Sequence, residues 1–179
     1  KILNTEYSDK LDEFYRLGGT SGGARPKIMT TIDEEEWIIK FPAHVDGKNA
    51  GKMEYDYSCC ARKCGITMSE TKLFPSEVCE GYFGIKRFER ISDISGTKRV
   101  HMVTAAALLE LDFEQPSLDY HSLMKLTKII TRDNKDDVEN MFRRMCFNVF
   151  AHNRDDHSKN FTYLYDESAD SWRLSPAYD

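Results

Sequence analysis

The stretch AHNRDDHSKNF, residues 151–161, constrains this chain most, because it places histidines, asparagines and charged side chains directly after an apolar helical pattern. That pattern covers residues 136–152, where apolar side chains recur at helical spacing and predict one buried face. Asp136 or Asp137 could cap the start of the helix. We therefore expect a buried helix that leads into a functional loop. The predicted buried face consists of Val138, Met141, Phe142, Met145 and Val149.

Two strand patterns, residues 160–165 and 172–175, flank a loop of turn-forming residues and predict a β-hairpin. Antiparallel pairing brings the start of one strand near the end of the other, so Asn160 and Asp179 should lie close together, and Asp155 can reach the same place. Amide and carboxylate oxygens suit Mg²⁺, and a second carboxylate can accept a proton from an attacking hydroxyl. An Asx-turn or a cap cluster would explain this spacing without catalysis.

The rest of the chain predicts mainly strands first and helices later. This order favours an α+β fold with a β-rich lobe over 1–90, a mainly helical lobe over 91–179 and a cleft between them. The expected elements are a hairpin of 27–31 and 36–41, a helix over 54–65 ending at Gly65, strands in ETKLFPS (70–76) and YFGIKRFER (82–90), a polar turn in SDISGTK (92–98), and helices in 104–111 and 117–130.

A lysine at the end of the apolar strand WIIK, Lys40, precedes Glu54 near the start of a predicted helix. A strand lysine oriented by a helix glutamate holds the α- and β-phosphates of ATP in kinases. A surface lysine and an unrelated glutamate would give the same pattern. The glycine-rich GGTSGG, residues 18–23, could cover phosphates with backbone N–H groups, but it does not match the Walker motif, and a flexible linker explains it equally well.

Composition narrows the classes of partner. The net charge is -5 and the sequence pI is near 5.6, so the chain as a whole lacks the positive charge that attracts nucleic acid backbones. Five cysteines without metal-site spacing fit free thiols, and no apolar run is long enough to span a bilayer. We expect a cytoplasmic protein. Lys1 and Asp179 both look like cut ends, so we expect the natural protein to continue.

Together these segments resemble the HipA-like serine/threonine kinases, the toxin kinases of bacterial toxin–antitoxin modules. The resemblance runs from about Gly18 to Asp179 and rests on GGARPK, WIIKFP, IKRFER, RVHM, MFRRMCFNVFAHNRDDHSKNF and WRLSPAYD. It implies that Asp155 is the catalytic aspartate and that Asn160 and Asp179 are magnesium ligands. It also implies that His157 supports the catalytic loop and that Lys159 approaches the γ-phosphate of ATP.

The resemblance extends to the nucleotide site. It implies that Lys40 holds ATP phosphates with Glu54 as its ion-pair partner, and that backbone groups around Lys86 and Phe88 bond adenine. Family members can phosphorylate a serine in their glycine-rich loop, which silences the kinase. Here that position is Thr20, with Ser21 adjacent, so self-phosphorylation is a hypothesis. The loop residues closest to the phosphates would be Gly22 and Gly23.

The implied cofactors are ATP and Mg²⁺. The implied partners are a protein substrate, such as a translation factor or an aminoacyl-tRNA synthetase, and an antitoxin protein, with no direct nucleic acid contact and no membrane. Two alternatives stay open. A phosphatidylinositol-type lipid kinase also carries Asp-x-His-x-x-Asn, although its metal motif ends in Asp-Phe-Gly rather than AYD, and a catalytically dead kinase fold could serve as a binding module.

Overall fold

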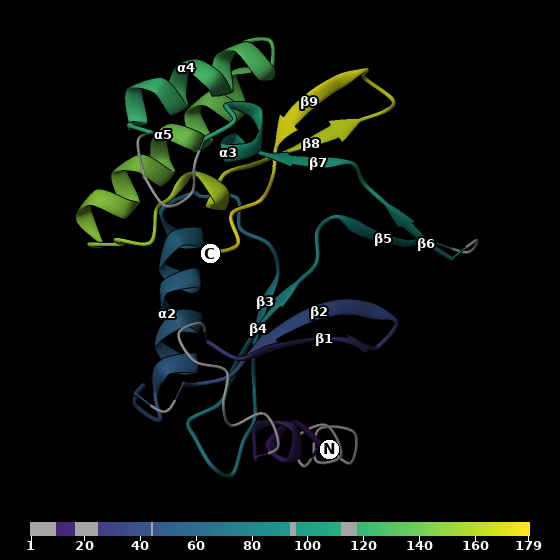
Figure 1. The fold of residues 1–179 in the computed structure, drawn as a ribbon, viewed down its shortest axis with the longest axis vertical. Coiled ribbons are helices and arrows are strands. Elements are labelled where there is room, and N and C mark those ends of the chain that lie inside the picture. Colours follow the sequence, from purple (N-terminus) through teal and green to yellow (C-terminus); the bar gives the residue numbers. More distant parts are fainter. Residues whose placement is uncertain (1–9, 17–24, 44, 94–95, 112–117) are drawn as a thin grey trace. The chain divides into compact units, whose positions relative to one another are not determined.

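The computed structural model describes residues 10–16, 25–43, 45–93, 96–111 and 118–179 of the chain. The chain divides into two compact units, which are described separately below. The first unit combines Lys1–Cys60 with Glu70–Arg87, and the second combines Ala61–Ser69 with Phe88–Asp179. The mixture of helices and antiparallel sheets confirms the predicted α+β class (Figure 1).

The first unit is built on a four-stranded antiparallel sheet with the order β1-β2-β4-β3. The predicted hairpin is confirmed as β1 and β2, and the two later strand predictions are confirmed as β3 and β4, although β4 ends at Lys86 rather than continuing to residue 90. The hairpin turns at Asp33 and Glu34, whose φ angles of 52° and 63° are both left-handed, as a two-residue turn that matches the strand twist requires. The strands are β1 (Lys27–Ile32), β2 (Glu35–Lys40), β3 (Thr71–Phe74) and β4 (Tyr82–Lys86).

A buried aspartate stands inside the core of the first unit. Asp12 lies in a helix over residues 10–16 and is only 3% exposed. Its carboxylate accepts hydrogen bonds from the hydroxyls of Ser76 and Tyr82 and from the backbone N–H of Glu77, at 2.6, 2.7 and 3.0 Å. Helix 10–16 is thereby fixed to the chain between β3 and β4. The surrounding apolar cluster contains Leu11, Ile32, Trp37, Ile39, Phe41, Phe74 and Tyr82.

Helix α2 (Ala50–Lys63) confirms the predicted helix but begins before residue 54. Gly65, with a φ of +76°, follows its end as predicted. Near the start of α2, a Cβ on Gly51 would lie 2.3 Å from the carbonyl oxygen of Gly81, so only glycine lets the helix approach the residue before β4 this closely. This close approach fixes the helix turn that carries Glu54.

In the second unit, part of the sequence predicted as a polar turn forms strands instead. The segment SDISGTK overlaps β5 (Arg90–Asp93) and β6 (Gly96–Arg99), which pair antiparallel, so the prediction of a turn alone was wrong. The predicted C-terminal hairpin is confirmed as β8 (Thr162–Asp166) and β9 (Ser171–Leu174). A third strand that was not predicted, β7 (Met102–Thr104), pairs with β8.

Three helices accompany this sheet: α3 (Ala105–Leu108), α4 (Tyr120–Ile130) and α5 (Lys135–Phe150). They confirm the three helical patterns, although α3 is much shorter than expected. The cap of α5 is Asn134, whose side chain accepts the backbone N–H of Asp137, so the proposed caps Asp136 and Asp137 were wrong. The core contains Ala105, Leu123, Met141, Phe161 and Tyr163.

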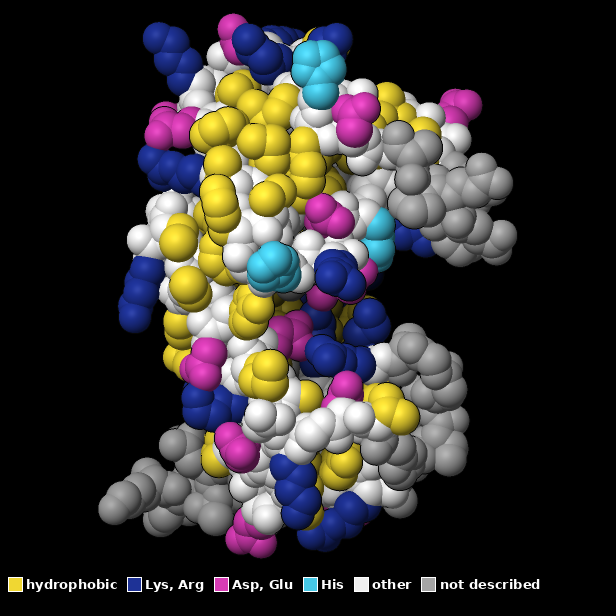
Figure 2. Space-filling view, turned by 90° about the vertical axis from the view of Figure 1, so that its left-hand side faces the viewer, with side chains coloured by type: hydrophobic (Ala, Val, Ile, Leu, Met, Phe, Trp, Pro, Cys, Tyr) yellow, Lys and Arg dark blue, Asp and Glu magenta, His cyan; other side chains and the backbone are white. Residues whose placement is uncertain are grey.

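The buried face of α5 also differs from the prediction. Met141 is buried, but Phe142 and Val149 are 52% and 58% exposed. The other buried side chains of α5 are Asp137 and Arg144, which bond to Arg173 and to the carbonyl of Ser175. The inner face of the helix is therefore partly polar, because it meets the strand β9 and the backbone after it. Apolar side chains gather on the surface of this unit (Figure 2).

Within the described part of the chain, no helix combines the length and the hydropathy that crossing a membrane requires. All five cysteines are free thiols, as the sequence predicted.

Candidate active site

The first unit joins Lys40 to Glu54. Lys40 is the last residue of β2, and its Nζ lies 2.6 Å from Oε1 of Glu54 on α2. The two side chains are 15% and 22% exposed, so the pair is largely shielded from water and its attraction is stronger than that of a surface pair. Lys40 Nζ also lies 5.6 Å from the centre of the Phe83 ring. A cation is thus held at a fixed position at the end of the strand.

Arg25 extends this ion pair, and the sequence reasoning missed it. Its Nη1 lies 3.5 Å from Oε2 of Glu54, and its Nε lies 3.0 Å from Oδ2 of Asp46. The backbone N–H of Ala43 donates to Asp46 and, together with Arg25, lowers the pKa of that carboxyl. Glu54 therefore stands between two cations. The signal for Arg25 was its place in GGARPK, just before β1.

Lys86, at the end of β4, belongs to a different ion pair. Its Nζ bonds Glu35 and lies 3.6 Å from Oε2 of Glu70, and the bond to Glu35 raises the pKa of Lys86. The backbone N–H of Lys86 donates to the carbonyl of Glu70 at 2.9 Å. Because strand pairing uses this N–H, an adenine contact through it would require the pairing to open. Phe88 belongs to the second unit, where its ring centre lies 5.4 Å from that of Tyr178.

The glycine-rich loop positions Thr20, Ser21, Gly22 and Gly23 lie outside the described residues.

In the second unit, the loop after α5 surrounds Asp155 with polar contacts. Asp155 is exposed, and its Oδ1 lies 3.1 Å from Nε2 of His157. The amide of Asn160 donates to the backbone carbonyl of Asp155 at 2.7 Å, and the backbone N–H of Asp155 donates to Asn153 at 3.1 Å. Asp155, His157 and Asn160 therefore lie within one small loop. Its backbone is fixed by two asparagine side chains, while the Asp155 carboxylate stays accessible to solvent.

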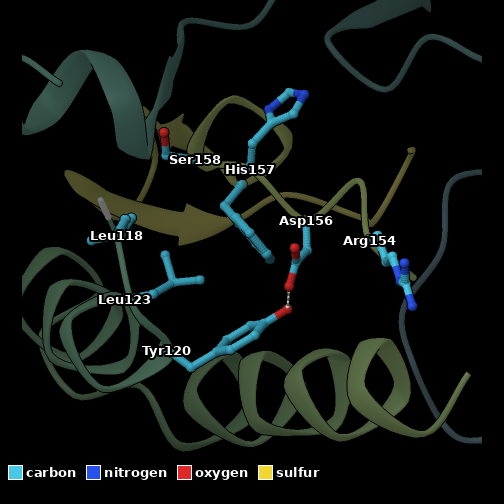
Figure 3. Close-up of a pocket in the computed structure, with 8 residues that line it drawn as sticks. Leu118, Tyr120, Leu123, Arg154, Asp156, His157 and Ser158 are labelled. Carbon is cyan, nitrogen blue, oxygen red and sulfur yellow. Dashed lines mark hydrogen bonds between the residues drawn. The ribbon is translucent and has the colours of Figure 1, made fainter. Parts of the chain in front are cut away.

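The neighbouring Asp156 lines a pocket of about 340 Å³, which His157 also lines. Its Oδ2 accepts a hydrogen bond from the hydroxyl of Tyr120 at 2.6 Å, and that hydroxyl also accepts from Asn148 at 2.9 Å. Burial and the bond to Asp156 raise the pKa of Tyr120. Figure 3 shows Asp156 and Tyr120 directed toward each other and His157 directed away from them. The adjacent aspartates thus have different surroundings, with Asp156 bonded to α4.

The end of the second hairpin lies against the same loop. The hydroxyl of Tyr178 donates to the backbone carbonyl of Lys159 at 2.8 Å and lies 2.6 Å from Oγ1 of Thr162. The backbone N–H of Ser175 donates to the carbonyl of Thr162 at 2.9 Å, which extends the β8–β9 pairing. Asp179 is the residue that follows Tyr178 in the chain.

The residues that hold this loop, Asn153, Tyr120 and Tyr178, were missed as site residues. Asn153 carried a detectable signal, because an asparagine two residues before an aspartate commonly accepts the backbone N–H of that aspartate. Tyr120 and Tyr178 act through tertiary contacts that no local pattern reveals. In the described part of the chain, no group of three or more His, Cys, Asp or Glu side chains could hold a metal ion. A cation here would need amide or backbone oxygens as well.

Comparison with known proteins identifies relatives of this fold. Residues 19–179 match the family model of the HipA-like C-terminal domain. No curated protein matches the sequence. Among solved structures, HipA of the Shewanella oneidensis MR-1 toxin–antitoxin system, in complex with HipB and its operator DNA, aligns with a TM-score of 0.74 and 15% identity. That alignment covers 96% of this chain and 49% of HipA.

A second solved structure, the Helicobacter pylori proinflammatory kinase CtkA, aligns with a TM-score of 0.63 and 15% identity. The alignment covers 89% of this chain and 56% of CtkA. The chain thus spans about half the length of each of these two proteins. At this identity the likeness establishes a shared, kinase-like fold.

Proposed function

We propose that this chain, which belongs to the family of HipA-like C-terminal domains, is part of an ATP- and Mg²⁺-dependent protein serine/threonine kinase. The observation that supports this most is the loop around Asp155. Its backbone is held by Asn153 and Asn160, while its carboxylate is exposed beside His157. An accessible carboxylate on a restrained backbone suits a residue that accepts a hydrogen bond or a proton from the hydroxyl group of a protein substrate.

In this proposal Asp155 accepts or orients the proton of the substrate hydroxyl as that oxygen attacks the γ-phosphate. His157, 3.1 Å from Asp155, restrains the carboxylate in its orientation. Lys159 supplies positive charge toward the γ-phosphate, and the bond from Tyr178 to its carbonyl fixes the backbone below it. These residues accelerate transfer by position and charge rather than by covalent chemistry.

Asn160 and Asp179 would hold Mg²⁺. The Nδ2 atom of Asn160 already donates to Asp155, which leaves its Oδ1 as the oxygen offered to a cation. An amide oxygen and a carboxylate form the hard, oxygen-only donor set that Mg²⁺ prefers, so the residues fit the ion. When bound, the ion would neutralise phosphate charge.

Lys40 would hold the α- and β-phosphates of ATP, and its ion pair with Glu54 supports this role. We place the adenine contact at the backbone near Phe88 rather than at the N–H of Lys86, because the latter donates to Glu70. Gly22 and Gly23 would cover the phosphates, and phosphorylation of Thr20 or Ser21 would disfavour ATP by like-charge repulsion.

We further propose that the kinase is a growth-inhibiting toxin of a bacterial, cytoplasmic toxin–antitoxin pair. HipA, which shares the fold, was solved with HipB and operator DNA, and this supports an antitoxin partner here. The net charge of -5 gives this chain no footprint for nucleic acid of its own. The substrate would be a protein of translation, such as a translation factor or an aminoacyl-tRNA synthetase.

Transfer of labelled phosphate from ATP to proteins of a bacterial lysate tests this function. The informative variants are Asp155→Asn and its neighbour Asp156→Asn, which make the same charge change on adjacent residues. We expect Asp155→Asn to lower transfer by roughly 100-fold or more while ATP still binds. Asp156→Asn should keep most activity, because its amide oxygen can still accept from Tyr120. Intact-mass analysis of the same reactions checks Thr20 and Ser21.

Equal activity of both variants would contradict the role of Asp155. Labelling of phosphoinositides instead of proteins would favour a lipid kinase. A growth effect that survives Asp155→Asn in the absence of any transfer would favour a binding module.

A further inference from the structure

The buried guanidinium of Arg144 contacts the backbone that leads to Asp179. Arg144 lies in α5 and is 5% exposed. Its Nη2 donates to the backbone carbonyl of Ser175, and its Nε donates to Oδ1 of Asn140 at 3.0 Å. Asn140 precedes Arg144 by one helical turn, so it orients the guanidinium from the same face of the helix. All of these residues belong to the second unit.

The same backbone is held on its other side by residues 67–69. The N–H of Ala177 donates to the carbonyl of Thr67 at 2.8 Å, and the N–H of Ser69 donates to the carbonyl of Ala177 at 2.9 Å. Asn140 also reaches this side, since its Nδ2 donates to Oγ1 of Thr67 at 2.9 Å. Asn140 and Arg144 therefore connect two of the contacts that hold the Ser175–Asp179 segment, in addition to those that Tyr178 makes with Lys159 and Thr162.

Arg144 occupies its position at an energetic disadvantage. Its Nη1 is buried and has no hydrogen-bond partner among the described residues. Burial lowers the pKa of Arg144 to about 10. A buried charge that lacks a bonded carboxylate destabilises a fold, and an apolar side chain of similar size often serves stability as well or better. An apolar side chain could not make the hydrogen bonds that Arg144 donates to Ser175 and Asn140.

We infer that Arg144 is a positioning residue, which through the carbonyl of Ser175 sets the location of Asp179 relative to the loop of Asp155. The catalytic part of this inference rests on the proposed function. A metal ligand needs a fixed place, and groups that support metal ligands typically contribute 10- to 100-fold in affinity or activity. Arg144 would therefore act on metal binding without touching metal or nucleotide.

Two variants of the full chain test the inference. Asn140→Ala removes the acceptor that orients Arg144 and also the bond from Asn140 to Thr67. Arg144→Lys keeps the charge but cannot make both bonds. Glu139→Ala is the matched control, because Glu139 is exposed on the same helix and forms its ion pair with Arg143. The measurements are the Mg²⁺ dependence of phosphate transfer and the hydrogen exchange of the Ala177 amide.

We expect Asn140→Ala and Arg144→Lys to weaken the apparent affinity for Mg²⁺ by about 10-fold and to raise exchange at Ala177 by a similar factor. The KM for ATP at saturating Mg²⁺ should change little, and Glu139→Ala should match the wild type. Faster exchange with unchanged Mg²⁺ dependence would overturn the inference, because it would show a purely structural role. Unchanged exchange would overturn it as well.

If the wild type transfers no phosphate, the proposed function fails on its own. Exchange at Ala177 and direct titration with Mn²⁺ then still decide whether Arg144 sets this segment. If Arg144→Lys does not fold, Asn140→Ala decides the question by comparison with Thr67→Val, which removes the bond from Asn140 to Thr67 and keeps the bond from Arg144 to Asn140.

Discussion

Nζ of Lys40 and Oε1 of Glu54 lie 2.6 Å apart, although fourteen positions of sequence separate the two residues. Replacing Lys40 by Met should lower kcat/KM for ATP by roughly 100-fold, because a preorganised cation at the phosphates is lost. Glu54→Gln should have a smaller effect of about 10-fold, since Lys40 remains but is less restrained. Steady-state kinetics at varied ATP concentration measure both.

Lys27→Met is the control for Lys40. Lys27 lies directly across from Lys40 on β1 and is exposed, so its loss changes the net charge of the sheet equally. Kinetics of Lys27→Met that resemble those of Lys40→Met would show that only bulk charge matters, contrary to the proposed contact.

Gly51→Ala tests the close approach of α2 to the residue before β4. Alanine favours a helix by about 1 kcal/mol over glycine, but its methyl group would lie 2.3 Å from a backbone carbonyl that cannot move freely. The clash should win, so we expect a net loss of about 2 kcal/mol in the free energy of unfolding. Because Glu54 lies on the same turn, the KM for ATP should rise. Denaturant unfolding and kinetics provide the measurements.

Gly47→Ala should behave differently. Its new methyl group would meet only the side-chain oxygen of Asn49, which can rotate away. A loss of stability as large as that of Gly51→Ala would mean that helix entry, not the contact with Gly81, is the cause.

Asp12 should make the stability of the first unit depend on pH. Burial alone would raise its pKa, but the hydrogen bonds from Ser76, Tyr82 and Glu77 outweigh burial and lower it below the ordinary value of 3.8. A carboxyl with a lowered folded pKa contributes stability that is complete above its unfolded pKa and is lost as pH falls through the folded pKa. Stability should therefore decline as pH drops below about 4.

Asp12→Asn should reduce the free energy of unfolding at pH 7 by about 2 kcal/mol, because an amide cannot accept all three bonds. It should also reduce the loss of stability on lowering the pH below about 4. Glu13→Gln, one residue along and exposed, is the control. Melting curves between about pH 3 and 7 test the prediction, because this range brackets an ordinary carboxyl pKa. If Asp12→Asn loses stability at acid pH as steeply as the wild type, the prediction is contradicted.

Tyr120→Phe should destabilise the loop of Asp155, because the Tyr120 hydroxyl bonds the neighbouring Asp156. The change leaves Asp156 without the hydroxyl that donates to it and removes an acceptor from Asn148. We expect a loss of about 1–2 kcal/mol in unfolding free energy and a several-fold lower rate of transfer. Thermal melting and kinetics measure these effects, and a wild-type rate with full stability would show that this support is dispensable.

Local patterns in the sequence predicted most of the strands and helices, because these carry their own periodicity and, as at Gly65, their own stop signal, but they missed β5, β6 and β7. The turn at Asp33 and Glu34 was placed correctly even without glycine. The buried face of α5 was predicted wrongly, since Arg144 and Asp137 are buried by polar partners in β9 and beyond it. Such partners come from distant sequence, and hydrophobic periodicity cannot anticipate them.

Prediction of the candidate site from sequence patterns had the same limit. The spacing of Asp155, His157 and Asn160 placed them in one loop, because a short loop leaves little freedom. Two further contacts depend on tertiary packing. Arg25 is the second cation at Glu54, and Tyr120 bonds Asp156. One sequence without that packing does not reveal them.

The bond between Arg144 and Ser175 has an unequal consequence for mutational tolerance. Arg144 contributes its side chain, whereas Ser175 contributes only its backbone carbonyl to this contact. In a saturation library selected for activity, position 175 should therefore accept alanine or glycine, limited mainly by its small buried volume. Position 144 should accept almost nothing but arginine.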